Sequence, residues 1–150
     1  MQDMRYLNLF SKTTGVSTRF CFKYNDFIVF SVNKNLVSKA IGENGKNVKR
    51  INEILGRKIK IISNPEGLKD AKHFISEIVS PIGFKDLEMT NDEIIIVSSG
   101  IQSKAGLIGR NKRRLFELQK VIKDFFGRNL RIALDLFAIK KGFFSSGKSL

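Results

Sequence analysis

Apolar positions along the chain switch repeatedly between a helical period and a strand period, and these switches divide the chain into two halves. In the first half, Val48, Ile51 and Leu55 lie three and then four residues apart, as expected for one face of a helix. The whole pattern predicts helices over 6–14, 36–41 and 46–55 and strands over 17–23, 27–32 and 58–63. Gly15 and Gly56 end the first and third of these helices, because glycine readily adopts the left-handed conformation that follows a helix.

The second half repeats the same order of elements. Helices are predicted over 68–79, 101–108 and 113–126, and strands over 82–89, 93–98 and 129–134. Each half reads helix–strand–strand–helix–turn–helix–strand, which indicates a duplicated unit. Proline and glycine within residues 64–67 break the pattern, so we expect one domain over 1–66, a second over 67–134 and a basic tail over 135–150. The tail holds Phe137, Phe143 and Phe144, which we expect to cap the second core in preference to docking on a partner.

A glycine-containing turn, residues 42–45, opens directly into a basic helix, and a degraded copy recurs at residues 109–112. Glycine has no side chain to hold off a nucleic-acid backbone, and the free N–H groups at a helix start bind phosphate oxygens. The sequence therefore predicts that two turns contact RNA. The candidate RNA-binding residues are Gly42, Glu43, Asn44, Gly45, Lys46, Lys49 and Arg50 in the first copy and Gly109, Arg110, Asn111, Lys112, Arg113 and Arg114 in the second.

The charge of the chain favours the same kind of partner. Of the 150 residues, 27 are Lys or Arg and 14 are Asp or Glu, which gives a formal net charge of +13. A surplus of this size, with basic residues clustered around glycine turns, is typical of proteins that bind polyanions. The alternative is a basic surface that only keeps the protein soluble, and the clustering favours nucleic acid.

Other chemistry has little support in the sequence. The single cysteine, Cys21, and the single histidine, His73, form no ligand cluster, so we expect both to be structural and expect no metal or cofactor. A nucleotide-binding P-loop is excluded, because Ala40 and Asn47 stand where that motif needs its first glycine and its hydroxyl. We expect no enzymatic activity. The chain has no signal region and no apolar run long enough for a bilayer, so we expect a cytoplasmic protein.

Two tandem units of this order, each with a Gly-x-x-Gly-like turn between two helices, resemble type II KH domains. The chain resembles in particular the archaeal NusA-like transcription termination factors, over about residues 4–134. The most specific stretches are residues 36–55 (LVSKAIGENGKNVKRINEIL), 104–118 (KAGLIGRNKRRLFEL) and 5–16 (RYLNLFSKTTGV). The resemblance implies an α+β fold in which each KH domain has a three-stranded sheet packed against helices.

The sequence departs from the family pattern at Lys112, where the second KH domain usually has its second glycine. A lysine at a position of positive φ costs about 1 kcal/mol and keeps a phosphate further away. We therefore expect the second turn either to have a changed loop or to bind RNA less selectively, as an electrostatic clamp formed with Arg110, Arg113 and Arg114.

The sequence and the resemblance together predict a monomeric protein that binds single-stranded RNA and acts in transcription termination or antitermination. RNA polymerase is a further expected partner. Two alternatives remain at this point: a module that docks on RNA polymerase with RNA contact secondary, and a ribosome-associated or ribosome-assembly KH protein.

Overall fold

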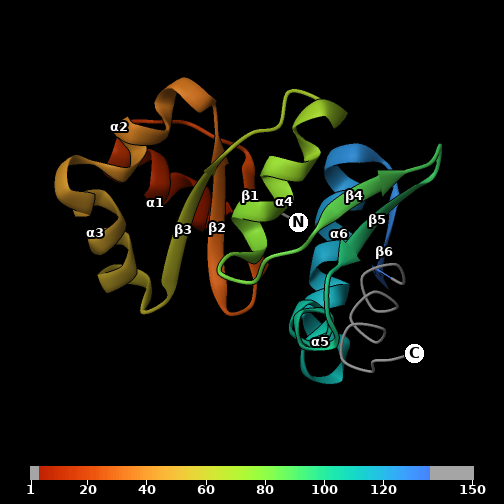
Figure 1. Ribbon diagram of the computed structural model, residues 1–150. Helices are drawn as coiled ribbons and strands as arrows, with labels where there is room; N and C mark the ends of the chain where they lie inside the picture. Colours follow the sequence, from red (N-terminus) through yellow and green to blue (C-terminus); the bar gives the residue numbers. More distant parts are fainter. Residues whose placement is uncertain (1–3, 136–150) are drawn as a thin grey trace, which may run out of the picture. The chain divides into compact units, whose positions relative to one another are not determined.

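The computed structural model describes residues 4–135 and has an α+β architecture (Figure 1). This part of the chain contains six α-helices and two three-stranded sheets, each sheet formed by three strands of one half of the sequence. The chain divides into two compact units between Ile78 and Val79. The predicted tail, with its three phenylalanines, lies outside the described residues apart from Asp135.

In the first unit, one helix precedes a hairpin and two helices precede the last strand. The elements are α1 (Met4–Thr14), β1 (Phe20–Tyr24), β2 (Phe27–Val32), α2 (Val37–Ile41), α3 (Lys46–Leu55) and β3 (Lys58–Ser63). Strand β2 is central, antiparallel to β1 and parallel to β3, with Phe27 opposite Lys58. The rings of Phe10 in α1 and Phe30 in β2 stack with centroids 4.3 Å apart, so the core lies between the helices and one face of this sheet.

The other face of this sheet is covered by α4 (Ala71–Val79). Val29 and Ser31 of β2 point away from the first core and are nevertheless fully buried. Lys60 of β3 donates hydrogen bonds to the carbonyl oxygens of Glu77 and Ile78, at 3.1 and 3.2 Å. Burial lowers the pKa of Lys60 from its ordinary value of 10.5, and the Glu77 carboxylate offsets this only in part. The first compact unit therefore includes most of α4, which the sequence repeat assigns to the second copy.

From its first strand onward, the second unit repeats the order of strands and helices in the first. Its elements are β4 (Asp86–Met89), β5 (Glu93–Ser98), α5 (Ile101–Ile108), α6 (Arg113–Phe126) and β6 (Asn129–Leu134). Strand β5 is antiparallel to β4 and parallel to β6, and Glu93 stands opposite Asn129 as Phe27 stands opposite Lys58. Helix α6 has 14 residues and α3 has 10, so the second copy is one helical turn longer here.

Most predicted elements have the expected bounds, and the differences have local causes. The strand predicted over 82–89 is confined to β4, because the Ile82 N–H bonds back to the Val79 carbonyl and closes a turn. The helix predicted over 36–41 begins at Val37, because Lys34–Leu36 form a short 3₁₀ turn before it. In the helix predicted over 68–79, the first three residues, Leu68–Asp70, also form a 3₁₀ turn, and α4 begins at Ala71. Cys21 is buried as a small apolar side chain, in agreement with its expected role.

Candidate nucleic-acid interface

The first candidate turn joins α2 to α3 through three residues with positive φ. Gly42 has φ 82° and ψ 162°, Asn44 has φ 56° and ψ 25°, and Gly45 has φ 73° and ψ 21°. The Gly45 N–H donates to the Gly42 carbonyl oxygen at 3.0 Å, which closes the turn. In the described part of the chain no side chain caps the start of α3, and the N–H of its first residue, Lys46, donates to the Glu43 carbonyl oxygen.

The second turn has the same backbone conformation in spite of its lysine. Gly109 has φ 77° and ψ 172°, Asn111 has φ 56° and ψ 27°, and Lys112 has φ 61° and ψ 20°. The Lys112 N–H donates to the Gly109 carbonyl oxygen at 3.1 Å, just as Gly45 donates to Gly42. The expected positive φ at Lys112 is present, and the loop is not changed. The lysine therefore alters the charge and the strain of this turn but not its path.

The two glycine positions of each turn have different steric requirements. A Cβ on Gly42 would lie 2.9 Å from Asn47 Nδ2, and a Cβ on Gly109 would lie 2.7 Å from Arg114 Cγ and 3.0 Å from Arg114 Cβ. Both also occupy a φ/ψ region that only glycine populates freely. A Cβ on Gly45 would meet nothing within 4 Å, and its left-handed conformation is open to other residues at modest cost. This difference explains why a lysine is tolerated at position 112 while position 109 is a glycine.

One side chain in each copy ties the start of the long helix to the helix before the turn. Asn47 Nδ2 donates to the Lys39 carbonyl oxygen at 3.2 Å, and Arg114 Nη1 donates to the Gly106 carbonyl oxygen at 3.0 Å. These pairs occupy equivalent positions in the two copies. Arg114, a predicted RNA ligand, is thus partly buried and supports the turn. Sequence reasoning missed the supporting role of Asn47. The available signal was that Asn47 and Arg114, both with side-chain N–H donors, occupy the same position in the two copies.

The remaining candidate residues, most of them basic, lie at the surface around the turns. Exposed residues of the first site are Glu43, Asn44, Lys46, Lys49 and Arg50, and those of the second are Arg110, Asn111, Lys112 and Arg113. Arg113 has an acidic neighbour one helical turn later, with its Nε 3.7 Å from Glu117 Oε2. Each turn therefore presents cations next to a helix start that no described side chain caps, an arrangement suited to phosphate.

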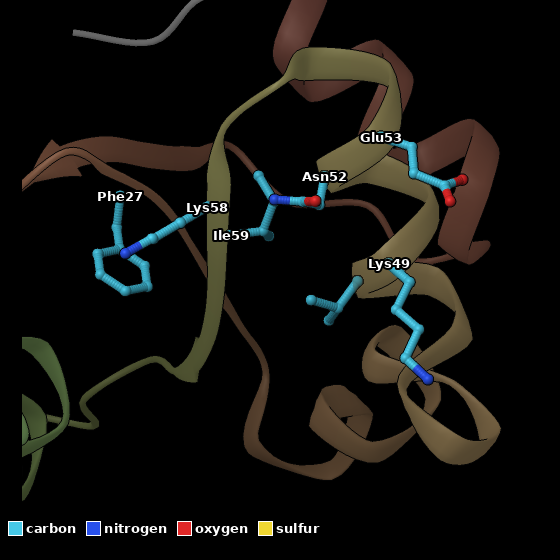
Figure 2. A pocket seen from close by; sticks show the side chains of 7 residues that line it. Phe27, Lys49, Asn52, Glu53, Lys58 and Ile59 are labelled. Carbon is cyan, nitrogen blue, oxygen red and sulfur yellow. The ribbon is translucent and has the colours of Figure 1, made fainter.

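A groove with a volume of about 380 Å³ runs between α3 and β3 in the first unit. Figure 2 shows Lys49, Asn52 and Glu53 extending from α3, Lys58 and Ile59 coming from β3, and Phe27 coming from β2. Val48 completes the lining, so a partly apolar floor has charged and amide groups at its edges. Lys49 belongs to both the predicted site and this groove. A base next to a phosphate held at the turn would find apolar surface and hydrogen-bonding groups here.

No group of three or more His, Cys, Asp or Glu side chains within residues 4–135 could hold a metal ion. Within the same residues, no helix combines the length and the apolar character that crossing a bilayer requires.

We expect Lys112→Gly to raise the free energy of unfolding by about 1 kcal/mol, because glycine adopts a φ of 61° without the strain of a side chain. The reciprocal variant, Gly45→Lys, should lower the free energy of unfolding by a similar amount. Urea unfolding monitored by circular dichroism measures both changes. A loss of stability in Lys112→Gly would mean that the lysine side chain makes a stabilising contact that outweighs the strain.

Comparison with known proteins finds three archaeal relatives that carry the same description. No protein-family model matches the chain. The chain is similar to the probable transcription termination protein NusA of Methanococcus vannielii, with 32% identity over 139 residues, which cover 90% of this chain and 79% of that protein. Proteins of the same description from Methanocaldococcus jannaschii and Halococcus morrhuae are 25% and 26% identical, over 81% of this chain and 67% and 91% of their own lengths.

A solved structure has the same fold at lower sequence identity. The crystal structure of APE1850 superimposes with a TM-score of 0.61 at 21% identity, and the match covers 88% of this chain and 96% of that one. The similarity to the Methanococcus protein extends over nearly the whole chain, both turns included, and it identifies the family. The chain belongs to the archaeal NusA-like transcription termination proteins.

Proposed function

We propose that this protein is a pair of type II KH domains that binds single-stranded RNA and acts in transcription termination or antitermination. The observation that carries the proposal is the repeated turn, with one backbone conformation in both copies, a following helix that no side chain within residues 4–135 caps, and exposed cations beside it. The strand order of each unit and the names of the relatives support the same conclusion. The residues that we propose as RNA ligands are those of the sequence prediction, with Arg114 and Asn47 holding the turns in shape.

In this mechanism no bond is made or broken. The RNA backbone crosses the turn at residues 42–45, where its phosphates accept hydrogen bonds from the start of α3 and pair with Lys46 and Arg50. The adjacent base enters the groove between α3 and β3, where Val48 and Ile59 offer apolar contact and Asn52, whose Nδ2 donates to the Arg57 carbonyl oxygen, offers its amide oxygen. The second turn extends the same kind of backbone contact, with more charge and one lysine in place of glycine.

The binding test compares short unstructured RNA with a hairpin stem and with duplex DNA, by fluorescence anisotropy at two salt concentrations. Because the groove accepts only unpaired bases, we expect affinity for the unstructured RNA to be on the order of tenfold higher. Binding should weaken steeply with salt, since cations on the protein displace counterions from phosphates. Equal affinity for the stem and for the unstructured RNA would overturn the proposal.

The cellular role needs a separate readout. In a reconstituted archaeal transcription reaction, we expect added protein to change the fraction of transcripts that end at a terminator. An unchanged fraction, with RNA binding intact, would assign the protein to another RNA-binding role such as ribosome association.

A further inference from the structure

Phe116 is a large apolar side chain that is not buried in the core of either unit. It lies on α6 and is 57% exposed. It stands three residues after Arg113, the first residue of α6, just as Lys49 stands three residues after Lys46, the first residue of α3. The second unit therefore has an exposed aromatic ring where the first unit has a cation at the edge of its groove.

The surroundings of Phe116 are basic. Its neighbours three and four positions away along the chain are Lys112, Arg113, Gln119 and Lys120, of which three carry a positive charge. An apolar protein surface docking on this ring would have to remove water from Lys112, from Lys120 and from the Arg113–Glu117 ion pair, which costs free energy. An RNA strand supplies both a base for the ring and phosphates for the cations, so charge complementarity favours RNA as the occupant.

The groove side of α6 also differs from that of α3. Gln119 Nε2 donates to the Leu130 carbonyl oxygen at 3.1 Å, which bridges α6 to the edge strand β6. The equivalent residue of the first unit, Asn52, bonds instead to the carbonyl oxygen of Arg57, which precedes β3. A base that entered between α6 and β6 would find this strand carbonyl already occupied. A base stacked on the exposed ring of Phe116 would not need the Leu130 carbonyl oxygen as a hydrogen-bond acceptor.

We propose that the second unit holds an unpaired RNA base by stacking it on the ring of Phe116, while Lys112, Arg113 and Lys120 bind the flanking phosphates. This inference rests on the proposed RNA-binding function and adds a residue that the turn motif does not include. The two units then contact bases in different ways: the first in a groove with polar groups, the second on an open aromatic surface. Stacking accepts every base, so the second unit contributes affinity with little sequence preference.

The test uses the full chain and single-stranded RNA that carries 2-aminopurine at successive positions, because the fluorescence of this base falls when it stacks. We expect wild-type protein to quench at one position or more, and Phe116→Ala to lose that quenching and bind about tenfold more weakly. Phe116→Tyr keeps the ring and should keep both the quenching and the affinity. The slope of affinity against salt should stay unchanged in Phe116→Ala, since no charge is removed.

Ile101→Ala provides the matched control, because Ile101 is 71% exposed and lies on α5 of the same unit. It should bind RNA as the wild type does. The inference is overturned if Phe116→Ala binds RNA like the wild type, or if Phe116→Tyr is as weak as Phe116→Ala. Absence of RNA binding by the wild type would instead overturn the proposed function itself.

Discussion

The double variant Asn44→Asp/Lys46→Glu should bind single-stranded RNA about thirtyfold more weakly than the wild type, with its fold intact. The change places two new negative charges where a phosphate would sit, beside the existing Glu43, and removes one cation, which corresponds to the loss of about one charge-assisted hydrogen bond, or about 2 kcal/mol. Asp tolerates the left-handed conformation of position 44, and an acidic residue is favourable in the first turn of α3. Fluorescence anisotropy measures the affinity, and circular dichroism checks the fold.

A matched control makes the same two replacements at another turn of the first unit. Asn25 also has positive φ, at 51°, and Lys23 lies two residues away on β1, the sheet edge opposite to β3. Lys23→Glu/Asn25→Asp therefore changes the net charge equally without touching the candidate site. We expect only a small loss of affinity from this control. Equal losses in the two double variants would show that RNA responds to the total charge and not to the turn at residues 42–45.

The variant Gly109→Ala should lower the free energy of unfolding by about 3 kcal/mol. The new Cβ would lie 3.0 Å from Arg114 Cβ, which rotation of the arginine side chain cannot move away, in a backbone region that only glycine populates freely. The shift in the urea midpoint reports the loss, and hydrogen exchange of β5 amides locates it in the second unit.

Lys112→Ala is the control for this effect, because lysine and alanine both have a Cβ and both carry the strain of positive φ at this position. We expect its free energy of unfolding to stay within about 0.5 kcal/mol of the wild type. A loss in Lys112→Ala as large as that in Gly109→Ala would mean that the two positions have the same steric demands. That result would contradict the structure, in which a Cβ at position 109 meets Arg114 and a Cβ at Gly45, the equivalent of position 112, meets nothing within 4 Å.

The local elements of this fold were accessible from the sequence because each depends on nearby residues. Helices α3 and α6 have their predicted bounds, since an apolar stripe begins after a turn and a left-handed glycine ends each of them. The packing of α4 on the first sheet was not accessible, because it depends on the contact of Lys60 with carbonyl groups of Glu77 and Ile78 far along the chain. No short-range pattern records such a contact.

The positions of the two candidate turns were predictable from the sequence, and the contacts that support them were not. The alignment of Lys112 with Gly45 left open whether the second turn keeps a positive φ or has a changed loop, and the structure shows a φ of 61°. The supporting bonds of Asn47 and Arg114 were missed because an amide and a guanidinium look unrelated in sequence, although both donate to the same backbone position. Phe116 was not predicted as a ligand, because a single apolar residue outside the turn motif carries no sequence signature of RNA binding.

The different demands of the two glycine positions bear on how such turns are found in other sequences. A search for two glycines three residues apart would recover residues 42–45. In the second copy it would match residues 106–109 and overlook the turn at 109–112, although the two turn backbones follow one path. The two copies share an obligatory first glycine, an asparagine two residues later and a basic residue at the helix start. A pattern built on these three positions, with the second glycine left open, would detect diverged copies that the usual motif discards.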